Sequence, residues 1–183
     1  DNNQALTLDD NGNGSLKDFI KTFIISAAME AQAAGTDLSS APYLTRDTNG
    51  TIIDVDWDAY IHQVGRQKAP GAFDSRANDS GENNLFGTQT VDNSHFTTNG
   101  TYFGTDDNSN NNLYIANHKQ VHMMNPMYYL GDARANNAHY YYIRYGTADA
   151  NTSIAIPIIA GVKAADLGYH VNLKTPWDIG HRG

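Results

Sequence analysis

The sequence predicts an α/β fold, and two observations support this prediction. Near its end, an aromatic and β-branched segment, an apolar helical pattern and a segment of alternating polarity follow one another, which indicates a strand–helix–strand unit. Such crossovers are almost always right-handed and join parallel strands, so the unit predicts part of an open sheet. In addition, hydrophobic residues make up 40% of the 183 residues, which is enough to form a core.

The first expected element is a helix that starts at Ser15 and ends before Gly35. Ser15 and Asp18 can form a pair that resembles a capping box. Apolar residues then recur at helical spacing, and they are Leu16, Phe19, Ile20, Phe23, Ile24 and Ala27. This spacing predicts a helix with one buried face.

Residues 36–117 have a different character, with short apolar patches between turn sequences such as TNG, NDSG, TTNG and DDNSNNN. A stretch of this length is too long for a single loop without structure. We therefore expect it to contain short helices and hairpins of its own.

The strand–helix–strand unit occupies residues 139–177. HYYYIRYG, at 139–146, predicts a strand, and YHVNLKTPW, at 169–177, predicts a second one. Between them, residues 152–168 predict a helix that Thr152 or Ser153 caps and Gly168 closes. Pro157 fits this helix if it lies in the first turn, where its missing N–H costs no hydrogen bond.

Composition argues against several classes of function. The formal net charge of −8, without a basic stripe, makes nucleic acid an improbable partner. No apolar run approaches the roughly 20 residues that span a bilayer, so we expect a soluble protein without a membrane partner. The absence of cysteine excludes thiol nucleophiles and disulfides, but it leaves the location open between secreted and cytoplasmic.

Asp149 and His181 are the candidate catalytic residues. Each follows one of the two predicted strands, and parallel pairing would bring both to the carboxyl edge of the sheet, where reactive groups collect. An acid followed by a histidine 32 residues later matches the end of the nucleophile–acid–histidine order of α/β-hydrolases. In the alternative interpretation, Asp149 forms a turn and His181 is a solvated loop residue.

The sequence contains no serine in a G-x-S-x-G motif. Ser75 and Ser80 lie in loop-like sequence, and Ser153 lies at a helix start, so none occupies the strand-to-helix turn that exposes a nucleophile. If the triad interpretation holds, the serine lies upstream of residue 1.

No cofactor or metal site is predicted. DDNGNG at 9–14 begins like a calcium loop, but Ile20 stands where the bidentate acid is expected. His118 and His122 would share one face of a helix, yet Val121 stands where the H-x-x-E-H form of the zinc protease motif has its glutamate.

Three segments resemble bacterial tannases, the tannin acyl hydrolases that group with feruloyl esterases among the α/β-hydrolases. They are MNPMYYLG at 124–131, YYIRYGTADANTS at 141–153 and PWDIGHRG at 176–183. The resemblance implies that 118–183 is the C-terminal part of the catalytic core and that 1–117 belongs mainly to a mixed, loop-rich lid inserted before it. It also implies a chain cut at both ends, with the serine in the preceding half.

A weaker resemblance concerns the substrate. GRQKAPGAFD at 65–74 and NDSGENNLFG at 78–87 are similar to the segment in which tannases place a lysine and a glutamate against the phenolic hydroxyls of a galloyl group. The corresponding residues are Lys68 and Glu82; without the resemblance they would be ordinary surface charges. Tannases also carry an acid two positions after the triad acid, and this chain has Asn151 there, which points to a relaxed phenolic specificity.

These observations predict a tannase-like serine esterase that cleaves gallate or related phenolic esters with Asp149, His181 and a serine from a companion chain or segment. The 183 residues alone are expected to be inactive. One alternative is a feruloyl or other acyl esterase of the same fold. Another is a secreted, non-catalytic module that binds carbohydrate or polyphenol, which would leave Asp149 and His181 more than about 10 Å apart instead of the roughly 2.6–3.2 Å of a triad contact.

Overall fold

Two compact units make up the chain in the computed structural model, which describes residues 5–68, 73–109 and 111–181. One unit combines residues 1–67 with residues 140–183, and the other contains residues 68–139. The first unit therefore joins segments from both ends of the sequence.

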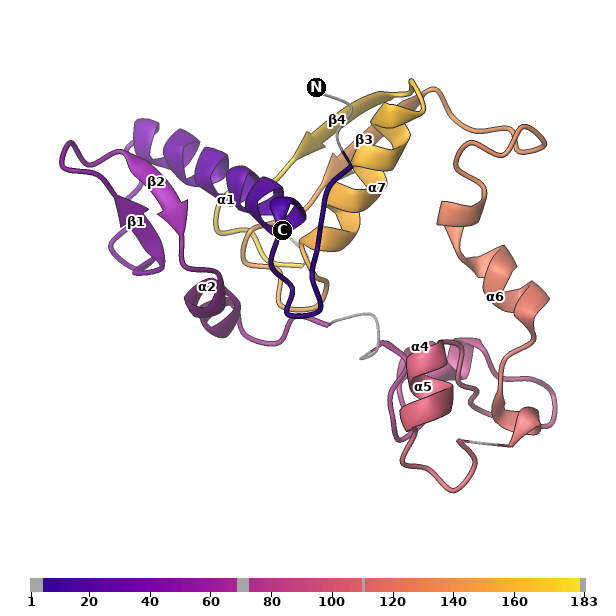
Figure 1. The fold of residues 1–183 in the computed structure, drawn as a ribbon. Coiled ribbons are helices and arrows are strands. Elements are labelled where there is room, and N and C mark those ends of the chain that lie inside the picture. The colour runs from indigo at the N-terminus through magenta and orange to yellow at the C-terminus, as the bar shows by residue number, and fades with distance from the viewer. Residues whose placement is uncertain (1–4, 69–72, 110, 182–183) are drawn as a thin grey trace. The chain divides into compact units, whose positions relative to one another are not determined.

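The first unit contains a long helix, a β-hairpin, a short helix and the strand–helix–strand unit (Figure 1). These elements are α1 (Ser15–Ala33), β1 (Leu44–Arg46), β2 (Ile52–Val55), α2 (Trp57–Val64), β3 (Tyr140–Arg144), α7 (Ala155–Asp166) and β4 (His170–Lys174). Strands β1 and β2 pair antiparallel, whereas β3 and β4 pair parallel, with Tyr140 opposite His170 and Arg144 opposite Lys174. The prediction of two parallel strands joined by a helix is confirmed.

Helix α7 follows the prediction except at its start. Pro157 is its third residue, in the first turn, and Gly168 adopts a φ of 84° just after the helix, as a closing glycine does. The assigned helix starts at Ala155, and Ile154 before it has no capping side chain, but the Ser153 hydroxyl accepts a hydrogen bond from the Ala155 N–H at 3.3 Å, as a cap by Ser153 predicts. Ile154 and Ile158 are also fully buried, and the burial of each contributes about 1.5–3 kcal/mol.

The predicted cap of α1, by contrast, is wrong. The residue before the helix is Gly14, and no side chain caps it. Gly14 has a φ of 141°, and a Cβ there would lie 2.4 Å from the Thr7 carbonyl oxygen, so only glycine fits. The Ser15 hydroxyl accepts a hydrogen bond from the Thr7 backbone N–H instead, at 2.9 Å.

The core of the first unit brings α1, the hairpin and α2 together with the C-terminal strands. Its fully buried residues include Ile24, Val55, Tyr60, Ile154 and Ile158. The compact units therefore do not follow the predicted boundary between 117 and 118. The assignment of 1–117 to a lid and of 118–183 to a catalytic core stays a prediction.

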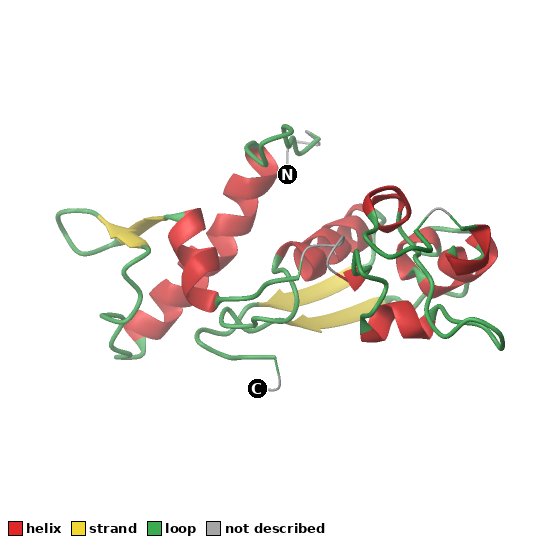
Figure 2. Ribbon diagram, turned by 90° about the horizontal axis from the view of Figure 1, so that it is seen from below, coloured by secondary structure: helices red, strands yellow, loops and turns green. Residues whose placement is uncertain are grey.

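Helix α7 covers one face of the two-stranded sheet (Figure 2). A Cβ on Gly161 of this helix would touch Ile143, Val171 and Leu173, which point toward it. The alternate residues point the other way, so Tyr140 and Tyr142 are 77% and 74% exposed. The strands thus have one covered face and one open face.

The second unit consists of short helices and loops, as expected for this part of the sequence. Its described helices are α4 (Gly81–Leu85), α5 (Thr98–Phe103), η1 (Asn112–Tyr114), α6 (His118–Met124) and η2 (Pro126–Tyr128). Ser80 and Asn83 form a complete capping box at the start of α4. Side-chain caps of this kind stabilise helices that are too short to be stable alone.

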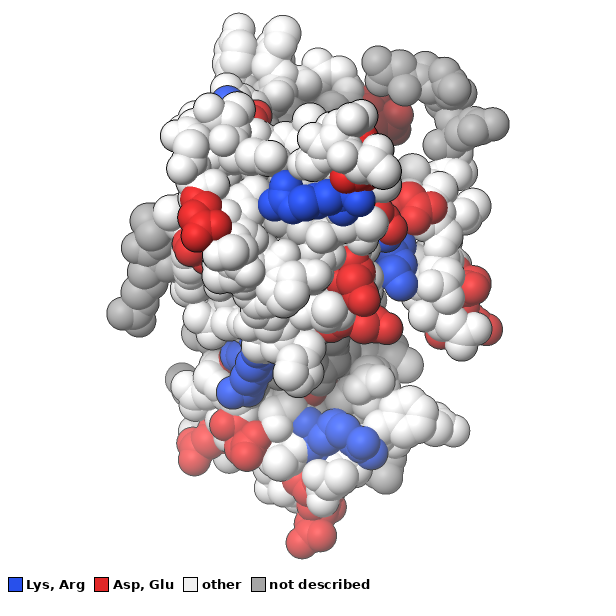
Figure 3. Space-filling model, turned by 90° about the vertical axis from the view of Figure 1, so that its left-hand side faces the viewer, with Lys and Arg blue, Asp and Glu red and all other residues white. Residues whose placement is uncertain are grey.

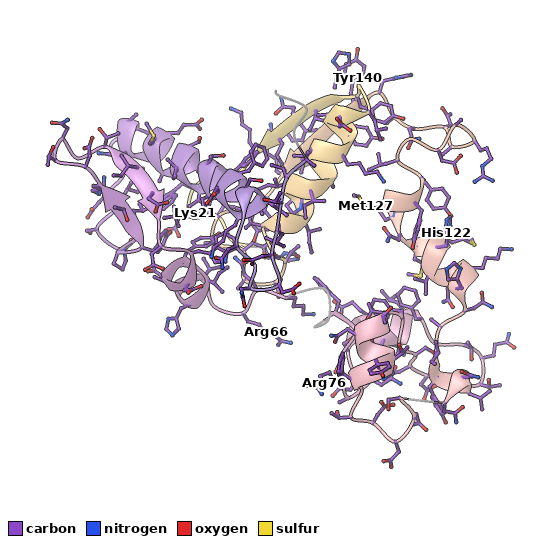
Figure 4. The ribbon with its side chains drawn as sticks, in the orientation of Figure 1. Lys21, Arg66, Arg76, His122, Met127 and Tyr140 are labelled. Atoms are coloured by element: carbon purple, nitrogen blue, oxygen red, sulfur yellow. The ribbon has the colours of Figure 1, made fainter. Side chains whose placement is uncertain are left out.

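Lysine and arginine do not gather into a patch on the face of the molecule that Figure 3 shows. On the face that Figure 3 shows, lysine and arginine lie singly among acidic and neutral residues. Lys21, for example, extends from α1 to the carboxylate of Asp54 on β2 (Figure 4). None of the described helices combines the length and the apolar character needed to cross a bilayer.

Candidate functional site

The loops that follow β3 and β4 lie against each other at the carboxyl edge of the sheet. Backbone hydrogen bonds continue the pairing beyond the strands, from Tyr145 N to Lys174 O at 3.2 Å, Thr147 N to Pro176 O at 3.1 Å and Ala148 N to Ile179 O at 3.0 Å. The parallel register brings both loops to one edge, and these bonds fix them side by side. Asp149 lies in the loop between β3 and α7, the acid loop, and His181 lies in the segment that follows β4, the histidine loop.

Asp149 is held by backbone donors on one side and faces the histidine on the other. Its Oδ1 accepts hydrogen bonds from the N–H groups of Asn151, at 2.8 Å, and Thr152, at 3.1 Å. Its Oδ2 lies 2.9 Å from Nδ1 of His181. Because Asp149 is only 5% exposed, these contacts fix its carboxylate in one orientation.

The contact determines which nitrogen of His181 carries the proton. A carboxylate only accepts hydrogen bonds, so Nδ1 must donate and Nε2 is the basic nitrogen of the neutral ring. The side chain of His181 is 48% exposed, which leaves it open to a reacting group. A histidine oriented by a buried carboxylate is the arrangement of a general base in a catalytic triad.

Tyr145 holds the loop around Asp149, and Gly146 lets the two loops approach each other closely. The Tyr145 hydroxyl lies 2.5 Å from the carbonyl oxygen of Thr152 and 3.1 Å from that of Asp149, so it ties down the loop around the acid. Burial raises the pKa of Tyr145, so its hydroxyl stays a donor. A Cβ on Gly146 would lie 1.9 Å from the Ile179 carbonyl oxygen, so a larger residue would push the histidine loop away.

Lys68 and Glu82, the predicted phenol-binding residues, contact each other within the second unit. The Lys68 ammonium lies 3.1 Å from Oε1 of Glu82 and 5.4 Å from the centre of the Phe73 ring. Burial would raise the pKa of the Glu82 carboxyl, but its own backbone N–H and the Lys68 ammonium outweigh burial and lower it. The carboxylate is therefore ionised and can accept a hydrogen bond.

Asn151 is exposed two residues after Asp149, and its backbone N–H helps to hold that carboxylate. The structure thus brings Asp149, Asn151 and His181 together in the first unit, and Lys68 and Glu82 together in the second.

A second histidine–carboxylate cluster, in the second unit, carried no sequence signal. Nδ1 of His95 lies 2.7 Å from Asp74 and Nε2 lies 2.9 Å from Asp106. Asp74 also accepts hydrogen bonds from Asn83 and from the backbone and side chain of Thr97. His95 is fully buried and both ring nitrogens are engaged, so it holds the unit together and is not available as a base.

This cluster predicts how the stability of the second unit depends on pH. Burial lowers the pKa of His95, but its bonds to Asp106 and Asp74 outweigh this and raise it above its ordinary 6.5. The contribution of His95 to the free energy of unfolding is therefore complete below pH 6.5, and it is lost as the pH rises through the raised pKa. Burial raises the pKa of Asp74, but hydrogen bonds lower it below 3.8, so its contribution is lost at acid pH.

Hydrogen-exchange protection of the Phe96 and Thr97 amides, which donate to Asp74, should consequently decrease above neutral pH. A His95→Gln variant should lose that alkaline dependence, whereas replacing the exposed His62 should not affect it. Protection that increases with pH in this range would contradict the linkage.

Other candidate sites are weaker. A hollow of about 450 Å³ lies between α1 and the end of β4, lined by residues that include Phe23, Arg144 and Trp177, but Asp149 and His181 do not line it. His122 packs its ring on Tyr128, at 4.2 Å between centroids (Figure 4). Among the described residues, no group of three or more histidine and acidic side chains is placed to hold a metal ion.

Comparisons with known proteins identify relatives among solved structures. A tannin acyl hydrolase from Lactobacillus plantarum superimposes with a TM-score of 0.88 and 35% sequence identity over 98% of this chain. A tannase from Fusobacterium nucleatum does so with a TM-score of 0.83 and 37% identity, also over 98%. The chain spans 38% of the length of either relative. No family model and no curated protein matches.

Proposed function

Since this chain is similar to part of the bacterial tannases over nearly all of its length, we propose that it belongs to a serine ester hydrolase that cleaves esters of gallic or related phenolic acids. Solved structures of tannin acyl hydrolase include complexes with 3,4-dihydroxybenzoate and with ethyl gallate, which supports a phenolic acyl group. A companion segment with a G-x-S-x-G motif supplies the nucleophile. The full-length protein is the polypeptide in which this chain adjoins that segment.

The observation that carries the proposal is the contact of 2.9 Å between His181 and Asp149. This distance is within the range of a triad contact, and it argues against a binding module in which the two residues are unrelated. In the proposed interpretation, β3 and β4 are strands of an α/β-hydrolase sheet, residues 118–183 complete its catalytic core, and residues 1–117 belong mainly to the lid.

The serine oxygen attacks the ester carbonyl while its proton passes to Nε2 of His181. The same proton then moves to the oxygen of the leaving alcohol, which leaves an acyl-serine. Water attacks the acyl-serine, gives its proton to Nε2, and the serine recovers that proton as the phenolic acid departs. Asp149 stabilises the imidazolium that forms in each half, and the companion segment supplies the oxyanion hole.

Hydrolysis of methyl gallate by the full-length protein tests this function. The 183-residue chain alone should be inactive under the same conditions, because it lacks the nucleophile. Absence of hydrolysis in the full-length protein across gallate, protocatechuate and ferulate esters would refute an esterase, and hydrolysis by the isolated chain would refute the companion serine. Preference for ferulate would favour the alternative, a feruloyl esterase of the same fold.

Lys68 and Glu82 are proposed to bind the phenolic hydroxyls. An ammonium donates to a phenolic oxygen and a carboxylate accepts from a phenolic O–H, so the pair matches two adjacent hydroxyls. Replacing Lys68 with Met or Glu82 with Gln should raise KM for methyl gallate roughly 10-fold and change kcat much less.

Two controls sharpen this prediction. Methyl benzoate has no ring hydroxyls, so its KM should stay nearly unchanged in both variants. Lys21→Met removes a lysine that pairs with Asp54 elsewhere, and it should leave the KM for methyl gallate unchanged. An equal increase of KM for methyl gallate and methyl benzoate would assign Lys68 and Glu82 a role other than hydroxyl recognition.

A further inference from the structure

Thr147 lies between the two loops of the candidate site and contacts both. It is 2% exposed. Its N–H donates to the Pro176 carbonyl oxygen at 3.1 Å, and its hydroxyl oxygen accepts from the Asp178 N–H at 2.8 Å. One buried residue on the acid loop thereby holds two points of the histidine loop, Pro176 through its backbone and Asp178 through its hydroxyl.

The bond to Asp178 fixes an unusual backbone turn. Asp178 has a φ of 54°, a left-handed conformation that few residues with a side chain adopt, although aspartate tolerates it better than most. Neighbouring contacts stabilise such a conformation. The Thr147 hydroxyl supplies a contact at this residue, and His181 follows three residues later.

A third contact holds Thr147 itself. The hydroxyl of Tyr60, on α2, donates to the Thr147 carbonyl oxygen at 2.7 Å. Tyr60 is fully buried, and this burial raises its pKa, so the hydroxyl remains a donor. Thr147 is therefore anchored to the core of the first unit on one side and to the histidine loop on the other.

We propose that Thr147 is a positioning residue for His181: its hydroxyl fixes the turn at Asp178 and thereby keeps Nδ1 of His181 against the Asp149 carboxylate. This role rests on the proposed function. Thr147 does not need to contact the substrate for this role, because it acts by fixing the position of the histidine loop.

The test compares three variants of the full-length protein. Thr147→Val removes the hydroxyl and keeps the shape, whereas Thr147→Ser keeps the hydroxyl. Thr175→Val is the matched control, because Thr175 is a buried threonine of the histidine loop whose hydroxyl donates to the Phe23 carbonyl oxygen of α1, not to the acid loop. The readouts are kcat and KM for methyl gallate, and the low-field proton signal of a histidine N–H that donates to a carboxylate, recorded with ¹⁵N-labelled histidine.

Thr147→Val should lower kcat roughly 10- to 100-fold with KM nearly unchanged, and it should weaken or shift the Nδ1–H signal. Thr147→Ser should restore both, and Thr175→Val should alter neither. Parent values of kcat and of the signal in Thr147→Val would overturn the proposal, and so would equal losses in the two valine variants.

If Thr147→Val does not fold, Tyr60→Phe removes the hydrogen bond on the carbonyl side of Thr147 and should shift the same signal; an unchanged signal would overturn the proposal. The signal does not depend on turnover. A parent protein that hydrolyses no ester would therefore refute the proposed function while the signal still decides the role of Thr147.

Discussion

Replacing His181 with alanine in the full-length protein should lower kcat for methyl gallate by roughly 10⁴- to 10⁶-fold. The reason is that both proton transfers of the proposed mechanism pass through Nε2 of this residue. The fold should survive, because the side chain is 48% exposed and, within the described residues, it hydrogen-bonds to the Asp149 carboxylate. Steady-state kinetics and a thermal unfolding midpoint together separate lost chemistry from lost structure.

The matched control is His62→Ala, which removes an exposed histidine at the end of α2 and should leave kcat unchanged. Asp149→Asn should act in the same direction as His181→Ala, because an amide does not stabilise an imidazolium as a carboxylate does. Parent rates in the His181 variant would end the triad interpretation.

Gly146→Ala should have the second largest effect, although Gly146 contributes no functional group. The added Cβ would lie 1.9 Å from the Ile179 carbonyl oxygen and 2.8 Å from the Ile179 Cβ, and a backbone atom cannot move away as a flexible side chain can. The histidine loop must therefore shift, and a shift of about 1 Å can cost 100-fold in kcat. Overpacking of this kind should also destabilise the protein by about 1–3 kcal/mol.

Gly161→Ala is the control for this substitution. Its Cβ would make ordinary contacts of 3.4–3.6 Å with side chains of β3 and β4, and alanine is favoured over glycine within a helix. This variant should keep the parent kcat and be as stable as the parent or slightly more so. Parent kcat in Gly146→Ala would show that the spacing of the two loops does not control the site.

Much of the local structure could be predicted from the sequence because it depends on residues close together in the chain. Alternating and helical spacing gave the order of β3, α7 and β4, and Pro157 and Gly168 lie where their backbone restrictions predict. The expected cap at Ser15 was wrong, whereas the Ser153 hydroxyl does accept a hydrogen bond at the start of α7. A side chain that could cap a helix does not by itself determine which residue occupies the capping position, because the packing of the preceding loop also determines where the helix begins.

Of the two histidine–carboxylate contacts, one could be predicted from the sequence and the other could not. Strand ends in a parallel sheet meet at one edge, so the positions of Asp149 and His181 after two predicted strands were enough to expect them near each other. No such rule relates Asp74, His95 and Asp106, which come from loops and short helices of the second unit. Their contact depends on how that unit packs.

By itself, the sequence determined the strand–helix–strand unit and the two loops after its strands that carry Asp149 and His181. Only the tertiary structure decided that residues 1–67 pack with residues 140–183, that Tyr60 reaches a carbonyl 87 residues away, and that Thr147 joins the two loops. The physical reason is range. Periodicity and turn chemistry act over a few neighbouring residues, whereas buried hydrogen bonds between distant segments exist only after the core has brought those segments together.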